Sequence, residues 1–144
     1  MKRLMLWILA LALMGSALTG TLHAQDITGT WQGTLKARTD VRLIVRISKE
    51  LDGSLQARVI LVDQNPPDWG SGVRANTASL EGADFKFKID SNKVTYEGKL
   101  SIDGNSISGT WSQGNPLPLE LRRATEATAW PDPTSHQSQL ITVD

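Results

Sequence analysis

Apolar and polar side chains alternate along most of the chain between residues 27 and 123. Successive side chains of a β-strand point to opposite faces of its sheet, so a period of two predicts strands that bury one face and leave the other in water. The alternating runs cover residues 27–36, 41–48, 54–61, 85–89, 94–100, 106–111 and 117–122, and a weaker run covers 77–81. Between residues 26 and 123 we find no helical period of useful length.

The breaks between these runs have the composition of tight turns. Most of the links are also only two to five residues long, which favours antiparallel neighbours and leaves no room for crossover helices. Four breaks contain residues that tolerate the positive φ angles of hairpin turns, namely Asp52-Gly53, Glu81-Gly82, Ser91-Asn92 and Asp103-Gly104-Asn105. We therefore predict an all-β fold, an antiparallel up-and-down meander of seven or eight strands.

Strands with one apolar face can hide it in a barrel or between two packed sheets. We favour a small closed or nearly closed barrel, because closure removes exposed sheet edges. A barrel of about eight strands has an interior that side chains fill, or that holds one small ligand. The expected interior residues are Trp31, Leu43, Val45, Val59, Leu61, Phe85, Phe87, Tyr96, Leu100, Ile107, Trp111, Leu119 and Leu121.

The N-terminus has the layout of a secretory signal peptide. Lys2 and Arg3 precede an almost wholly apolar stretch over residues 4–18, and Leu22-His23-Ala24 forms the exit. The apolar stretch of about 15 residues is short for a spanning helix, which needs roughly 20. An uncleaved N-terminal anchor is the alternative. We expect cleavage after Ala24 and a secreted or periplasmic protein that nothing holds in a membrane.

Three segments follow from these patterns: a signal peptide at 1–24, a barrel-like domain at 25–123 and a tail at 124–144. The tail contains Pro131 and Pro133 and is interpreted as a linker, or as the start of a further C-terminal domain. The whole chain has 15 basic and 15 acidic residues, and loss of Lys2 and Arg3 leaves 13 basic ones. Such a near-neutral chain lacks the field that gathers nucleic acid or an anionic bilayer, and we expect a monomer.

The sequence offers little chemistry for catalysis. It has no cysteine, no Gly-x-Ser-x-Gly, no His-Glu-x-x-His and no phosphate-binding glycine loop. His136 lies in the tail, where nothing holds it beside a nucleophile. Two carboxylate pairs, Glu81 with Asp84 and Asp63 with Asp68, stand at turns, where such residues mainly serve solubility. We expect no catalytic residue, no metal and no cofactor.

The segment from Asp63 to Asn76 interrupts the short turns with two prolines, two glycines and an isolated tryptophan. A long loop in a tight meander is often functional. Trp69 is either a plug that closes one barrel end or an exposed anchor for a ligand or partner domain. Arg74 is a candidate to pair with an acidic ligand, and Tyr96 is a candidate contact from the interior. Core packing is expected for Trp31 and Trp111.

Two repeated phrases carry a resemblance: Ile27-Thr-Gly-Thr-Trp31-Gln-Gly33 and Ile107-Ser-Gly-Thr-Trp111-Ser-Gln-Gly114. With 96–105 and 117–121, they resemble an N-terminal domain of secreted soil-bacterial proteins, notably of Acidobacteria. In those proteins it precedes an α/β-hydrolase or an uncharacterised domain. Residues 138–144 resemble the entry strand of such a hydrolase. The phrase Gly29-Thr30-Trp31 also resembles the Gly-x-Trp of lipocalins, which supports a lipocalin-like barrel.

Three functions remain open at this point. The resemblance implies a non-catalytic exported accessory domain, appended to or derived from a secreted hydrolase-type protein, with a hydrolase domain as its partner. The single-faced strands and the long loop instead suggest a stand-alone periplasmic module that binds a small apolar ligand. An enzyme in its own right is the third.

Overall fold

A computed structural model describes residues 26–63 and 72–133 of the 144-residue chain. In these ranges the chain forms nine strands and no helix that is long and apolar enough to cross a bilayer. The strands are β1 (Gly29–Lys36), β2 (Asp40–Lys49), β3 (Leu55–Leu61), β4 (Val73–Arg74), β5 (Thr77–Glu81), β6 (Asp84–Ile89), β7 (Val94–Leu100), β8 (Ser106–Gln113) and β9 (Asn115–Arg123).

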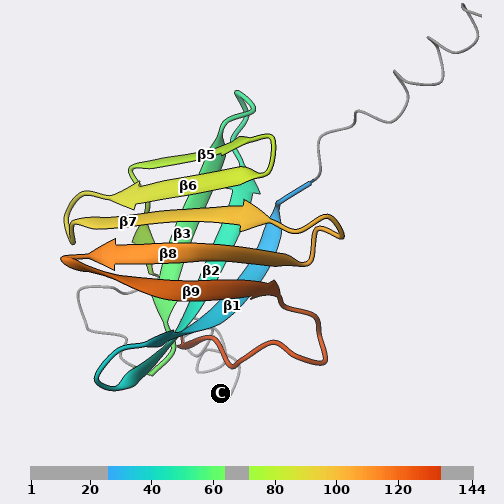
Figure 1. The fold of residues 1–144 in the computed structure, drawn as a ribbon. Coiled ribbons are helices and arrows are strands. Elements are labelled where there is room, and N and C mark those ends of the chain that lie inside the picture. The colour runs from blue at the N-terminus through green and yellow to red at the C-terminus, as the bar shows by residue number, and fades with distance from the viewer. Residues whose placement is uncertain (1–25, 64–71, 134–144) are drawn as a thin grey trace, which may run out of the picture.

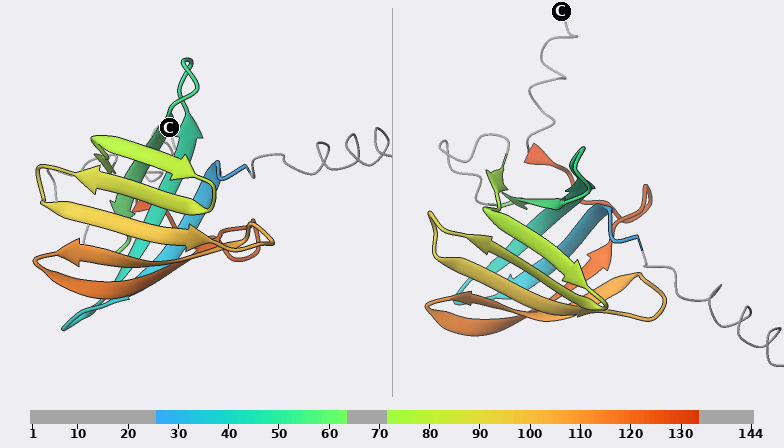
Figure 2. Two further views of the ribbon diagram at one scale, coloured as in Figure 1. Left: turned by 45° about the horizontal axis from the view of Figure 1, so that its top comes forward. Right: turned by 90° about the horizontal axis from the view of Figure 1, so that it is seen from above.

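All nine strands belong to one antiparallel sheet in the order β4-β3-β2-β1-β9-β8-β7-β6-β5. Each neighbour in that order is also a neighbour in the chain, except that β9 returns to pair with β1. In Figure 1, β5 to β9 form the front layer, and β1 to β3 cross behind it. The views of Figure 2 show the same sheet curling around one interior. The predicted antiparallel up-and-down meander is confirmed.

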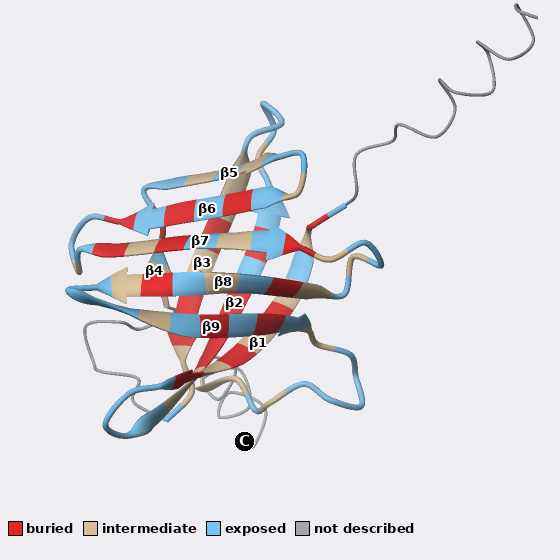
Figure 3. Ribbon diagram, viewed as in Figure 1, coloured by how far each residue is buried: buried red, intermediate tan, exposed pale blue. Residues whose placement is uncertain are grey.

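The alternation in the sequence becomes an alternation in burial, which Figure 3 displays along β6 to β9. In β6, for example, Phe85, Phe87 and Ile89 are buried, and the residues between them are exposed. Every residue that we expected inside belongs to the core, with Leu61 at its partly buried edge. The predicted turns are also present, and Gly82 takes the positive φ of 61° that its tight turn requires.

The predicted strand count is wrong by one. The additional strand, β4, lies in the segment that we expected to be entirely loop, and it pairs Arg58 with Arg74 and Val59 with Val73. Two residues are too short a run to show any period in the sequence, which explains why the pattern did not predict this strand.

The barrel is curled but incompletely closed. Ala75 N–H donates to the Ala57 carbonyl on β3, at 2.8 Å, and Asn76 N–H donates to Lys88 on β6, also at 2.8 Å. These two bonds bridge the gap between β3 and β5 at one point, and no ladder joins the two strands within the described residues. We call this gap the seam. The sheet is therefore a curled half-barrel, less closed than the closed or nearly closed barrel that we predicted, and β4 takes the outer edge of β3 near one end of the gap.

Residues 124–133, the first part of the expected linker, lie against the outer face of the sheet, and we call them the strap. Both ends of the Gln32 side-chain amide bind the strap. Its Nε2 donates to the Thr128 carbonyl at 2.8 Å, and its Oε1 accepts from Trp130 N–H at 3.0 Å. Arg46 pairs with Asp132. Whether residues beyond 133 form a linker stays a prediction, since they lie outside the described ranges.

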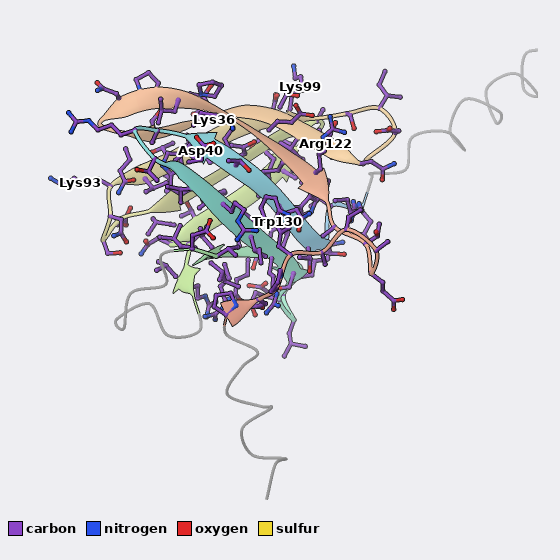
Figure 4. The ribbon with its side chains drawn as sticks, turned by 90° about the horizontal axis from the view of Figure 1, so that it is seen from below. Lys36, Asp40, Lys93, Lys99, Arg122 and Trp130 are labelled. Carbon is purple, nitrogen blue, oxygen red and sulfur yellow. The ribbon has the colours of Figure 1, made fainter. Side chains whose placement is uncertain are left out.

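Two buried residues, Ile44 and Ile60, point away from the barrel interior. Ile44 and Ile60 are opposite each other on β2 and β3, and their exposed fractions are 2% and 0%. Ile44 lines a hollow together with Trp130 of the strap. Figure 4 shows Trp130 over β1 and β2. At these two positions the outer face is therefore apolar and covered, with Gly72 beside Ile60, whereas alternation predicted a face open to water.

Candidate functional site

One end of the barrel is sealed around Trp31. The indole is fully buried, and its Nε1 donates to the Ile27 carbonyl at 2.9 Å. Arg123, the last residue of β9, lies over the indole ring with its Cζ 4.4 Å from the ring centroid. A guanidinium at this distance is held by a cation–π attraction and covers the ring from water.

Backbone carbonyls fix the position of this guanidinium. Arg123 Nη1 donates to Thr28 at 2.7 Å, Nη2 donates to Asp26 at 2.9 Å, and Nε donates to Gly104 at 3.2 Å. One side chain thus connects the chain before β1, the loop before β8 and the end of β9. We call this arrangement, with Trp31 beneath it, the cap.

The opposite end of the barrel holds a pocket of about 410 Å³, which we call the mouth. Residues of six strands and two turns line it: Leu35, Ala37, Val41, Leu43, Leu61, Asn92, Val94, Trp111, Gln113, Asn115 and Leu117. Most of this lining is apolar, and Leu43 and Trp111 belong to the buried core. The floor of the pocket is therefore the same packed interior that fills the barrel.

The mouth exists because β1 and β9 separate toward this end. Their ladder contains only Trp31 with Arg123 and Gln32 with Arg122. Further along β9, Pro116 and Pro118 replace residues that would donate toward β1. This direction follows from the neighbouring bonds: Ala124 N–H donates to Thr30 on β1, whereas Arg123 N–H donates to Asn105 on the side of β8. Since proline has no N–H, the two strands cannot continue their ladder through these positions.

Trp111 forms the aromatic wall of the mouth. Its ring stands edge-on to Phe87, with the centroids 6.2 Å apart and the planes at 73°. Its Nε1 lies 3.4 Å from Oε1 of Gln113, and Nε2 of Gln113 donates to the Asn92 carbonyl at 3.2 Å. This chain of contacts orients the Gln113 amide at the rim, where Asn92 and Asn115 also lie.

Two of the three sequence-predicted binding residues, Tyr96 and Arg74, do not line the mouth. Tyr96 is fully buried within the aromatic core, where its hydroxyl donates to the Leu119 carbonyl at 2.9 Å. Burial raises the pKa of Tyr96, so the hydroxyl keeps its proton for this bond. Arg74 on β4 forms an exposed ion pair with Glu50 at 2.8 Å. Trp69 lies outside the described residues.

Two of the candidate carboxylates, Asp63 and Asp84, lie beside cations, and Glu81 is the cross-strand partner of Asp84 at the turn between β5 and β6. Arg42 holds Asp63 with two nitrogens, the shorter contact being 2.6 Å, and this hydrogen-bonded pair keeps the pKa of Asp63 below its ordinary value. Asp84 lies 3.6 Å from Lys99 across the sheet. Within residues 26–63 and 72–133, no three His, Asp or Glu side chains are close enough to hold a metal ion. Asp68 and His136 are outside these ranges.

The residues that sequence reasoning missed are those of the mouth. Trp111 was expected to be core, and it is, but its outward side also borders the pocket. Leu35, Val41 and Leu117 belong to correctly predicted strands, and their role depends on where β1 and β9 part. The sequence did contain a signal, because two prolines two residues apart in a strand indicate an edge without a ladder.

Comparison with known proteins identifies no family: no family model and no curated protein matches the chain. Among solved structures, the chain is similar to the fluorescent protein UnaG. A point mutant of UnaG has 19% sequence identity and a TM-score of 0.39 over 69% of this chain and 96% of that one. Wild-type UnaG has 16% identity and a TM-score of 0.38 over 67% and 96%. These values carry no argument about a ligand, so the proposal below depends on the geometry of the mouth.

Proposed function

We propose that this chain is a non-catalytic binding module that holds one small apolar molecule in the mouth of its barrel. The observation that carries the proposal is a pocket of about 410 Å³ with leucine and valine walls and one tryptophan face. Sites for small molecules typically occupy roughly 300–1,000 Å³ and combine apolar walls with a few polar groups. A ligand here would cover apolar surface that water now contacts.

Two other hollows fit this function less well. The seam hollow, also of about 410 Å³, is lined by Leu55 and Leu80, but Asp26 and Lys49 add charges to its wall. A depression on the outer face of β6 to β8 is lined mainly by charged and hydroxyl side chains above paired glycines. Of these three hollows in the described part of the chain, the mouth has the most apolar lining and includes the core residues Leu43 and Trp111, so an apolar molecule gains contacts there on several sides.

The test is a titration with N-phenyl-1-naphthylamine, a neutral apolar probe whose emission rises in apolar surroundings. We expect saturable binding, a rise in the melting temperature, and quenching of tryptophan emission through Trp111. A ligand that binds the native state alone must stabilise it, so the binding curve and the melting curve should agree.

Two matched leucines locate the site. Leu117→Trp would fill the mouth, whereas Leu80→Trp adds the same bulk at the seam, and both leucines are partly buried now. We expect the first variant to lose probe binding by at least about tenfold, which corresponds to about 1.4 kcal/mol, and the second to bind normally. Equal loss in both variants, or no saturable binding to the wild type, would contradict the proposal.

A second candidate is the accessory role beside a hydrolase-type domain in an exported protein. The docked strap supports it, because bonds to Gln32 and Arg46 fix where the chain leaves the barrel. A following domain would thereby start from a defined point on the outer face. Sequencing the reading frame beyond Asp144 tests this role, and an immediate stop codon without a neighbouring hydrolase gene would contradict it.

A further inference from the structure

The polar groups at the mouth are amides, and this restricts the chemistry of the ligand. The described residues that line the mouth include no lysine, arginine, aspartate or glutamate, and their polar side chains are Asn92, Gln113 and Asn115. An amide offers both a donor and an acceptor but no charge. These groups suit the hydroxyl, carbonyl or ester of a ligand, and they leave the charge of an anion uncompensated.

Four cations, Lys36, Arg38, Arg42 and Lys93, are next to lining residues in the chain. Lys36 pairs with Asp40 at 2.8 Å, and Arg42 binds Asp63 on the outer face. The side chain of Lys93 points away from the barrel, as Figure 4 shows. In Figure 4 Lys36 and Asp40 also lie together. None of these four cations is among the residues that line the mouth.

We propose that the mouth selects neutral apolar molecules that carry an uncharged polar group, and discriminates against carboxylates of the same length. This inference depends on the proposed function and specifies its ligand class. A carboxylate that enters an apolar pocket loses hydration, and without a cation it must either pay that cost or take up a proton. A hydroxyl group loses less hydration free energy than a carboxylate does, and it can form hydrogen bonds with the amides at the rim.

The experiment compares 1-decanol with decanoate as competitors of N-phenyl-1-naphthylamine, at about pH 8, where a carboxyl group is ionised. We expect decanol to displace the probe at a concentration lower by about tenfold or more than decanoate requires. Lowering the pH to about 4 should bring the competing concentrations of decanol and decanoate closer together. At that pH, near the ordinary pKa of a carboxyl group, much of the decanoate is protonated and uncharged.

A charge-adding variant tests the cause. Asn115 is exposed at the rim, so Asn115→Lys should place a cation there without disturbing the core. We expect this variant to bind decanoate several-fold more tightly and decanol unchanged. Asn105→Lys, in the exposed turn below the cap, is the matched control and should change neither competitor. Circular dichroism and melting curves confirm that both variants fold.

The outcomes separate this inference from the proposed function. If the probe itself does not bind the wild type, the mouth is not a ligand site and both proposals fail. If the probe binds but decanoate competes as well as decanol does, the function stands and the selectivity is wrong. An unchanged affinity of Asn115→Lys for decanoate would likewise contradict the role of the uncharged rim.

Discussion

The two ends of the barrel place the same three-residue phrase in different surroundings. Gly29-Thr30-Trp31 leads into the cap, and Gly109-Thr110-Trp111 leads into the mouth. Both tryptophans point inward from strands that run in the same direction, because β1 and β8 are each antiparallel to β9. Trp31 lies near the start of β1 and Trp111 near the end of β8, so the two indoles face opposite ends of the barrel and meet different partners.

At the cap, both the ring face and the N–H group of Trp31 have a partner. Arg123 covers its face, and a backbone carbonyl accepts its N–H at 2.9 Å. At the mouth, Trp111 has a weaker contact of 3.4 Å with Gln113 and one side next to a pocket. The comparison indicates that β9 determines which end is sealed and which is open. Where β9 stays paired with β1, it places Arg123 over Trp31, and where its prolines end the ladder, a pocket opens.

The largest expected effect is the loss of Trp31. Trp31→Ala removes a fully buried indole and its bond, so we expect about 3–5 kcal/mol less stability, the usual cost of this change in a core. Trp111→Ala should cost less by at least about 1 kcal/mol, because part of that ring already borders open space. Urea unfolding of the two variants measures the difference. Equal costs would show that the mouth is packed as tightly as the cap.

Arg123 should be the next most important residue. Arg123→Met keeps a long side chain but removes the bonds to Asp26, Thr28 and Gly104, and we expect a loss of about 1–3 kcal/mol.

Its neighbour Arg122 provides the matched control. Arg122→Met removes an exposed contact with Glu120, at 3.1 Å, and should change stability by less than about 0.5 kcal/mol. If both arginine variants lose the same stability, the cap is an ordinary surface contact. Urea unfolding again provides the measurement, with unchanged m-values showing that the variants unfold from equally compact states.

The cap and the mouth were unequally accessible to prediction from the sequence. Alternation identified the strands and placed Trp31, Tyr96 and Trp111 inside, because the face of the sheet to which a side chain points follows from its position within its own strand. It did not identify the partner of each indole. The contact between Arg123 and Trp31 joins residues far apart in the chain, and only the pairing of β1 with β9 brings them together.

The outer face shows the same limit. Period two placed Ile44 and Ile60 on the side facing water, yet both are buried. The strap beside Ile44 contains Pro131, and proline-bearing tails are typical of linkers. No local pattern in residues 124–133 reveals that Gln32 and Arg46 hold them against the sheet. Apolar residues at outward positions of two adjacent strands were the one available hint.

The smallest expected effect is a change of melting temperature with pH, and it comes from the carboxylates in the two segments that support the cap. Hydrogen bonds from Thr28 lower the pKa of Asp26, and a bond from the Ser101 hydroxyl lowers the pKa of Asp103. These carboxylates order the two segments whose carbonyls bind Arg123. A pKa lowered by folding contributes stability above the unfolded value, about 3.9, and that contribution disappears as the pH falls through the folded value.

The variant Asp26→Asn/Asp103→Asn should therefore melt slightly below the wild type at neutral pH, since both carboxylates are exposed and their bonds are screened. The gap should close below about pH 4, because a protonated aspartate and an asparagine then offer similar bonds. Melting temperatures recorded from neutral pH to about pH 2 test this convergence. Asp63→Asn at the mouth end should converge in the same window without altering the emission of Trp31. A gap that stays constant across the window would mean that these turns do not couple the charge of their carboxylates to the folding of the cap.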